Sequence, residues 1–154
     1  MSGSFTTLFM QMYKGNKIRY VRNESPLLQC GAKVMAMPIN LKRAYEKPGP
    51  EDGYRVLVDR IWPRGISKDE LKIDEWMKEA APSDRLRKSF HNGELTWSEF
   101  RNGYLSELKS HRDELRRVVE KSKEGTVSLI FGARDEKHNN AVVMKQYLKM
   151  LGAG

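Results

Sequence analysis

The sequence predicts a small α/β domain with a mainly parallel sheet of three to four strands flanked by helices. Two apolar stretches, residues 54–59 and 126–131, have the composition of strands that are covered on both faces. A long stretch of helical patterning separates them, and such a crossover joins parallel strands through a right-handed connection. A further helical pattern follows the second stretch. Together these observations favour the α/β class.

The first two strands precede the helical stretch. Residues 39–45 ("INLKRAY") alternate between apolar and polar side chains, which is typical of a strand. The sequence leaves the pairing direction of this strand open. The next eight residues contain two prolines and two glycines, so they form a loop. Residues 54–59 ("YRVLVD") form the second strand.

Helical signals begin at Ser67. Ser67 and Glu70 stand three residues apart and form a capping box, in which each side chain accepts a hydrogen bond from a free backbone N–H. A short helix is therefore expected from about Lys68. We expect it to break and restart near Asp74 and to end before Pro82, because proline disfavours helical geometry in the preceding residue.

Two more helices follow Pro82. Ser83 is the expected cap of a helix that runs through Phe90. Thr96 and Glu99 form a second capping box. The helix after this box carries an apolar stripe at spacings of three and four residues: Trp97, Phe100, Tyr104 and Leu108.

The C-terminal part of the chain repeats the pattern of helix and strand. After a break at residues 110–113, a helix ends at Gly125, and residues 126–131 ("TVSLIF") form the third strand. Asp135 is the expected N-cap of a final helix. The apolar face of that helix consists of Ala141, Met144, Leu148 and Leu151.

The first 36 residues differ from the rest of the chain. They have no sustained period, although residues 17–22 ("KIRYVR") are compatible with a short strand. They carry five basic residues and one acidic residue, so half of the net charge of +8 lies there. We expect residues 1–36 to form a poorly ordered basic extension and residues 37–154 to form the single α/β domain. An initiator at Met35 or Met37 would place the extension upstream of the native start.

Composition argues against several classes of protein. The single cysteine, Cys30, excludes an internal disulfide framework, and the three histidines form no close pair that favours a metal site. No apolar run has the length of a membrane span, so we expect no membrane contact and a cytoplasmic location. The sequence lacks the phosphate-binding loop, the dinucleotide fingerprint and the nucleophile elbow, and we expect no cofactor.

Polar residues gather where the second and third strands end. In an open parallel sheet, ligands bind beyond the C-terminal ends of the strands. If these two strands are neighbours, the segments 59–65 ("DRIWPRG") and 131–139 ("FGARDEKHN") converge on one crevice. The candidate acid–base residues are Asp59 and His138, and the candidate ligand-binding residues are Arg60, Arg64, Gly132, Arg134, Asp135 and Asn139.

This set of residues favours an anionic ligand. Arginine binds phosphate or carboxylate through paired hydrogen bonds, and the free N–H groups of the last helix add a second anion-binding element. Gly132 lets the backbone approach such a ligand closely. The same residues also have structural interpretations. In these interpretations, Asp59 forms an ion pair with Arg64 or Arg134 or caps a turn. Asp135 serves only as an N-cap, and His138 forms a hydrogen bond with a neighbouring loop.

From about Ile39 to Leu151 the chain resembles the YeaO-like branch of a family of domains of unknown function. The resemblance rests on "DGYRVLVDRIWPRGISK", "APSDRLRKSFH", the helix with "W-x-x-F…Y…L" and "SLIFGARDEKHNNAVVMKQYL". It implies a compact three-layer α/β domain. Broader relatives look to have a cysteine on the last strand and a Cys-His-Arg run after it. Here the corresponding places are Phe131 and residues 139–141 (Asn-Asn-Ala), so the resemblance implies no thiol or metal role.

Three functions from different classes follow from the sequence. The first is binding of a small anion, such as a phosphate- or carboxylate-bearing metabolite or a nucleotide, in the strand-end crevice. The second is an enzyme of unknown reaction that uses Asp59 or His138 as acid or base there. The third is weak binding of nucleic acid through surface basic charge. The oligomeric state is left open.

Overall fold

The computed structural model describes residues 8–13, 17–22 and 38–154, and the chain divides into two compact units, residues 1–34 and 35–154. In the first unit, strands β1 (Leu8–Tyr13) and β2 (Lys17–Arg22) pair antiparallel, with Leu8 opposite Arg22. The sequence indicated the second of these strands and missed the first. The other residues of the segment 1–36 lie outside the described residues, so the poorly ordered extension stays a prediction.

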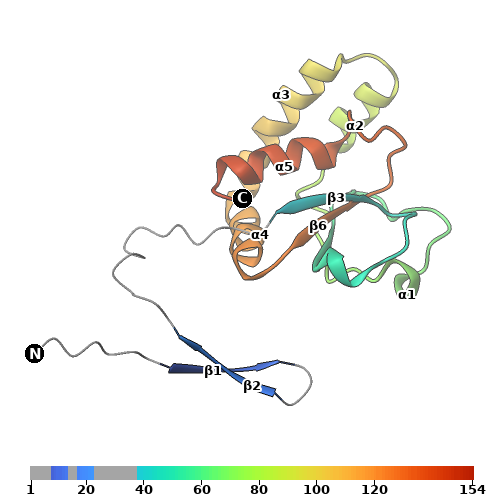
Figure 1. Cartoon of the computed structure of the whole chain (residues 1–154). Coiled ribbons are helices and arrows are strands. Elements are labelled where there is room, and N and C mark those ends of the chain that lie inside the picture. Colours follow the sequence, from blue (N-terminus) through green and yellow to red (C-terminus); the bar gives the residue numbers. More distant parts are fainter. Residues whose placement is uncertain (1–7, 14–16, 23–37) are drawn as a thin grey trace, which may run out of the picture. The chain divides into compact units, whose positions relative to one another are not determined.

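The second unit is built on a four-stranded parallel sheet (Figure 1). Its order is β3 (Ile39–Arg43), β6 (Val127–Phe131), β4 (Tyr54–Leu57) and β5 (Glu75–Trp76). Ile39 and Tyr54 both stand opposite Val127, so β3 and β4 flank β6 in the same direction. This confirms the predicted α/β class and the parallel pairing of the second and third predicted strands, and it shows that the first predicted strand is parallel too.

Helices cover the sheet unequally. Helices α3 (Trp97–Leu108), α4 (Arg112–Glu124) and α5 (Asn140–Met150) pack on one face, and α2 (Asp84–His91) lies on α3. The short α1 (Lys68–Leu71) covers the other face. The described residues also form 3₁₀ turns at Pro50–Asp52 and Lys109–His111, and the second lies at the predicted break between α3 and α4.

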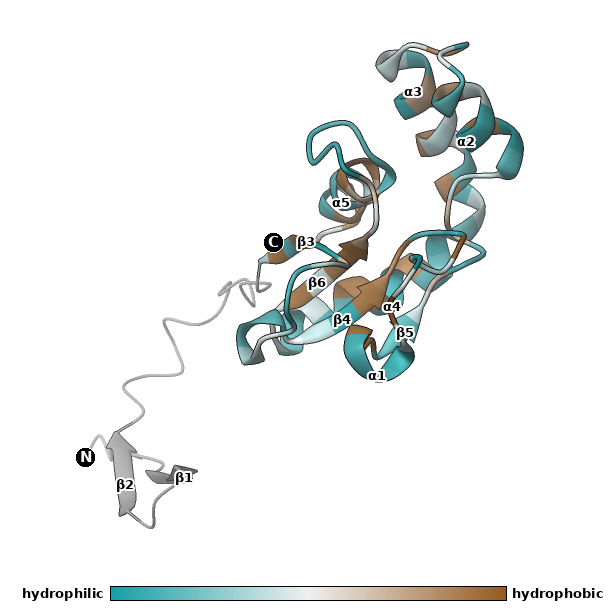
Figure 2. Cartoon of the chain, turned by 90° about the vertical axis from the view of Figure 1, so that its right-hand side faces the viewer, coloured by the Kyte–Doolittle hydropathy of each residue, from teal (hydrophilic) through white to brown (hydrophobic). Residues whose placement is uncertain are grey.

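The alternation of side chains along the central strands explains the two layers of packing. Val56 and Val58 join the large core under the helices, whereas Leu57 joins a smaller core with Leu71 and Ile130 on the other face. Figure 2 shows hydrophobic colour concentrated on β4 and β6. No helix among the residues that the structure describes is both long and apolar enough to span a membrane.

Three predicted helix caps are confirmed. Ser67 and Glu70 form the capping box of α1, and Thr96 and Glu99 form that of α3. The side chain of Ser83 accepts a hydrogen bond from the backbone N–H of Leu86 at the start of α2. These caps depend on residues three apart in the sequence, which is why local reasoning finds them.

The predicted helical restart near Asp74 is wrong, because the chain forms strand β5 there. The backbone N–H of Asp74 donates to the carbonyl of Arg55 at 2.8 Å, and that of Met77 donates to Leu57 at 2.9 Å. Buried Arg55 also donates to the carbonyls of Leu71 and Lys72 at 2.9 and 3.0 Å. The edge of β4 therefore binds this segment as a strand, which a helical spacing of apolar residues could not reveal.

The predicted start of the last helix is also wrong. Asn139, not Asp135, caps α5, and its side-chain oxygen accepts a hydrogen bond from the N–H of Val142 at 3.1 Å. Asp135 instead closes a turn, because its Oδ1 accepts from the N–H groups of Lys137 and His138. His138 therefore precedes the helix and does not lie in its first turn.

Candidate functional site

The ends of β4 and β6 open into one cavity of about 860 Å³. Because these strands are neighbours, the two segments that follow them meet at the same edge of the sheet, as the sequence required for a shared crevice. All eight candidate residues line this strand-end cavity: Asp59, Arg60, Arg64, Gly132, Arg134, Asp135, His138 and Asn139.

Asp59 connects three parts of the cavity wall. Its Oδ2 accepts a hydrogen bond from the backbone N–H of Gly132 at 2.7 Å, and its Oδ1 accepts one from the side chain of Asn140 at 3.0 Å. Burial raises the pKa of the Asp59 carboxyl group above its ordinary value, and these two hydrogen bonds only partly offset that effect. Asp59 makes no ion pair with any residue that the structure describes.

The contact with Asp59 leaves little room for a side chain at Gly132. A Cβ atom at position 132 would lie 3.1 Å from Oδ2 of Asp59 and 3.9 Å from Cβ of Pro63. A side chain there would require the carboxylate, which accepts from the N–H of Gly132, to shift by a few tenths of an ångström. The sequence predicts that the backbone at Gly132 can come close to a ligand. The group that lies close to it within the chain is the carboxylate of Asp59.

The three candidate arginines fall into two groups. Arg60 lies 3.8 Å from Asp84 and 4.0 Å from Glu79, so acidic groups already partly balance its charge. Arg64 and Arg134 are exposed, and neither side chain forms an ion pair or hydrogen bond with another residue in the described part of the chain. These two arginines therefore offer full sets of N–H donors to a ligand.

Asp135 and His138 form an exposed pair at the rim of the cavity. Nδ1 of His138 lies 3.0 Å from Oδ2 of Asp135, and the ring also packs edge-on against Trp97 at 5.1 Å between centroids. Hydrogen bonds from the N–H groups of Lys137 and His138 lower the pKa of Asp135. The carboxylate thus fixes the orientation of the imidazole ring, which is consistent with either an acid–base or a structural role.

The cavity includes residues that sequence reasoning missed. Helix α2 brings Arg87, Phe90 and His91 to its wall, and the first residue of α5 brings Asn140. Nδ2 of Asn140 donates to the carbonyl of Val58 at 2.8 Å as well as to Asp59. No local pattern in the sequence indicates that α2 brings residues to this cavity. The Asn-Asn pair at the start of an apolar helix, in contrast, could have indicated Asn140. Within the described residues, no three His, Cys, Asp or Glu side chains gather as a metal site requires.

Comparison with known proteins decides the family. Residues 38–151 match the inactive DUF488-N3 subclade of a family of domains of unknown function. The chain belongs to this subclade. It is 43% identical to the uncharacterised protein YeaO of Escherichia coli over 115 residues, which are 75% of this chain and all of YeaO. This confirms the resemblance to the YeaO-like branch.

More distant relatives occur in mycobacteria. The chain is 38% identical over 112 residues to uncharacterised proteins of Mycobacterium bovis and Mycobacterium tuberculosis, with 71% of this chain and 92% of each relative covered. No solved structure matches the chain.

Proposed function

We propose that this chain is a binding protein for a small molecule that carries a phosphate or carboxylate group. One observation supports it above all: Arg64 and Arg134 come from separate strand ends, line the same cavity and have no acidic partner among the described residues. Two guanidinium groups that line one cavity suit an anion, whose negative charge would replace the missing acidic partners.

The family favours binding over catalysis. The subclade to which the chain belongs is described as inactive. In this chain, buried Phe131 ends β6, and Asn139 and Asn140 use their side chains to hold the backbone and Asp59. These positions, at which broader relatives look to carry reactive side chains, thus serve structure here, while the arginines remain available to a ligand.

Calorimetric titration of the whole chain with inorganic phosphate and with citrate tests this proposal. Each of Arg64→Gln and Arg134→Gln is expected to weaken binding by about tenfold or more, because a hydrogen bond to a charged group contributes about 1.5–3 kcal/mol. Arg116→Gln is the matched control, since Arg116 is an exposed arginine of α4 outside the cavity. Absence of binding by the wild type, or equal affinity in all three variants, would contradict the proposal.

Acid–base catalysis in the same cavity is the second candidate, and the buried Asp59 carboxyl group is the observation that favours it. A carboxyl group with a raised pKa can hold or release a proton closer to neutral pH than an exposed one. His138 at the rim, oriented by Asp135, is the alternative acid or base. A screen of phosphoesters and nucleosides would support catalysis if the wild type turns one over and Asp59→Asn or His138→Gln does not. Indistinguishable rates would exclude it.

A further inference from the structure

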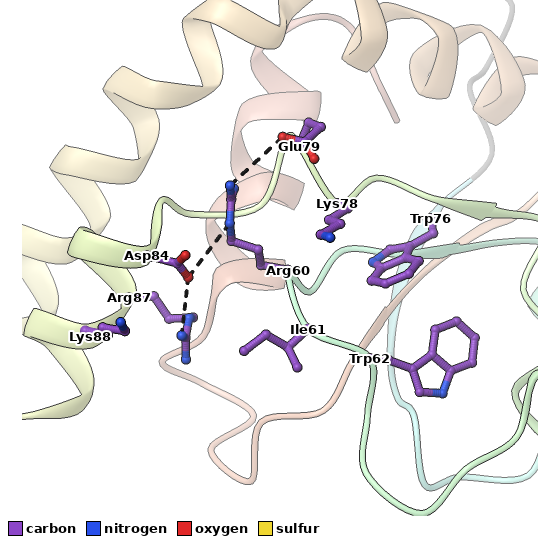
Figure 3. Close-up of a pocket in the computed structure, with 9 residues that line it drawn as sticks. All are labelled: Arg60, Ile61, Trp62, Trp76, Lys78, Glu79, Asp84, Arg87 and Lys88. Carbon is purple, nitrogen blue, oxygen red and sulfur yellow. Dashed lines mark hydrogen bonds and ion pairs between the residues drawn. The ribbon is translucent and has the colours of Figure 1, made fainter.

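A second cavity, of about 550 Å³, adjoins the strand-end cavity (Figure 3). The two share Arg60, Ile61 and Arg87 in their linings. Beyond these shared residues, the second cavity is lined on one side by Trp62 and Trp76 and on the other by charged residues of the loop before α2 and of α2 itself. The two cavities are therefore neighbours on the same side of the strand ends.

The second cavity exposes apolar surface that the rest of the fold does not cover. Ile61 is 57% exposed and Trp76 is 37% exposed, and they are two of only four large hydrophobic residues exposed in the described part of the chain. Both residues line the same cavity, and exposed apolar side chains that gather at one cavity mark a binding site more often than scattered ones do.

The indole of Trp76 is held in place from two sides. Its Nε1 donates to the carbonyl of Asp59 at 2.7 Å, and its ring meets that of Trp62 at 5.4 Å and 75°. Trp62 in turn donates to the carbonyl of Ile66 at 2.7 Å. Because both rings are fixed before any ligand arrives, binding against Trp76 costs little side-chain entropy.

The charged side of the second cavity has spare donors. The guanidinium of Arg87 makes one hydrogen bond, at 3.4 Å to Asp84, and its buried Nε has no acceptor among the described residues. Lys78 and Lys88 also line the cavity without an ion pair to any described residue, and Nζ of Lys78 lies 5.6 Å from the centre of the Trp76 ring. Cationic groups beside an aromatic platform suit a ligand that is both aromatic and anionic.

We propose that the ligand is an aromatic phosphate or carboxylate, with its acidic group between Arg64 and Arg134 and its ring against Ile61 and Trp76 in the second cavity. This rests on the anion binding proposed above. The aromatic residues of the first cavity are the less suitable place for the ring: Phe100 is buried, and Phe90 already stacks on Phe100 at 4.4 Å. Phe90 and Phe100 thus pack on each other, whereas Trp76 keeps 37% of its surface exposed beside its contacts with Trp62 and Lys78.

The test compares probes with and without a ring on the full chain. Ribose 5-phosphate and the four common nucleoside 5′-monophosphates share a sugar phosphate and differ by the base. At least one nucleotide is expected to bind the wild type about 5- to 150-fold more tightly than ribose 5-phosphate, the gain typical of stacking one base on an aromatic side chain. Trp76→Ala and Ile61→Ser should each bring the ratio of nucleotide affinity to ribose 5-phosphate affinity close to one.

Two further variants keep the test independent of folding. Trp76→Phe keeps a ring and loses the hydrogen bond to Asp59, so it should keep most of the gain. Phe90→Leu should keep all of it. If nucleotides bind no better than ribose 5-phosphate, or if the gain survives both Trp76→Ala and Ile61→Ser, the inference is overturned and the anion site stands. If neither type of probe binds the wild type, the proposed function fails as well.

Discussion

At the scale of single residues, Asp59 links the fold to the proposed site. It connects the ends of β4 and β6 by accepting a hydrogen bond from the N–H of Gly132. It also accepts one from the side chain of Asn140, the first residue of α5. Its burial has a measurable consequence, because a carboxyl group with a raised pKa resists ionisation in the folded state.

The stability of the protein should therefore depend on the ionisation of Asp59. The folded-state pKa lies above that of the unfolded chain, so the contribution of this residue is full below the unfolded pKa and is lost as pH rises through the folded pKa. Urea denaturation at a series of pH values should show the wild type losing free energy of unfolding relative to Asp59→Asn across that window. A relative gain for the wild type there would show that the pKa is lowered.

Asn140 should affect the pKa of the Asp59 carboxyl group. Asn140→Ala removes a hydrogen bond that lowers the pKa of Asp59 and leaves the carbonyl of Val58 without that donor. We expect a further rise in the pKa of Asp59 in an NMR titration and a loss of about 1–3 kcal/mol in the free energy of unfolding. Asn102→Ala, at an exposed position of α3, is the control. An unchanged pKa of Asp59 in Asn140→Ala would contradict the contact.

At the scale of elements, the turn before β4 depends on a glycine. Gly53 has φ +63°, and a Cβ atom there would overlap the carbonyl oxygen of Thr126. Gly53→Ala should lower the free energy of unfolding by about 2–4 kcal/mol through backbone strain and steric overlap together. Gly65 has φ +76° with open space around it, so Gly65→Ala should cost only about 1–2 kcal/mol. Thermal or chemical unfolding measures both losses. Equal losses for Gly53→Ala and Gly65→Ala would show that the overlap with Thr126 is relieved without cost.

The start of α5 gives a second test at this scale. Asn139→Ala should cost about 1 kcal/mol, because it removes the cap that accepts from Val142. Asp135→Ala should cost less, because Asp135 closes an exposed turn and caps no helix. Chemical denaturation of both variants measures the difference, and a larger loss in Asp135→Ala would restore the helix start that the sequence suggested.

The elements also show what could be predicted from sequence. Capping boxes and strands with a clear apolar pattern were found, because their signals lie within a few residues. Strand β5 was missed because its two residues are specified by the edge of β4 and by Arg55, which lie about twenty positions earlier. The two strand ends that line the cavity could be predicted for the same local reasons. Arg87 and His91 could not, because the packing of α2 on α3 brings them to the cavity.

At the scale of the whole molecule, the basic charge is divided between the two units of the chain. Every residue that lines the strand-end cavity lies between positions 59 and 140. Removal of residues 1–36 should therefore leave phosphate affinity within about twofold of the wild type, with calorimetry as the measurement. If the protein instead bound nucleic acid through its spread basic charge, removal of residues 1–36 would weaken its affinity for nucleic acid. That affinity would also fall steeply as the salt concentration rises.

The central claim is that an anion binds where β4 and β6 end. The most direct test is a titration of the ¹⁵N-labelled full chain with inorganic phosphate, followed by the shifts of backbone amide signals in NMR spectra. We expect saturable shifts that are largest in residues 59–65 and 131–140 and that shrink in Arg64→Gln and Arg134→Gln. Spectra that do not change, or shifts that centre on the exposed side of α4 and persist in both variants, would contradict the claim.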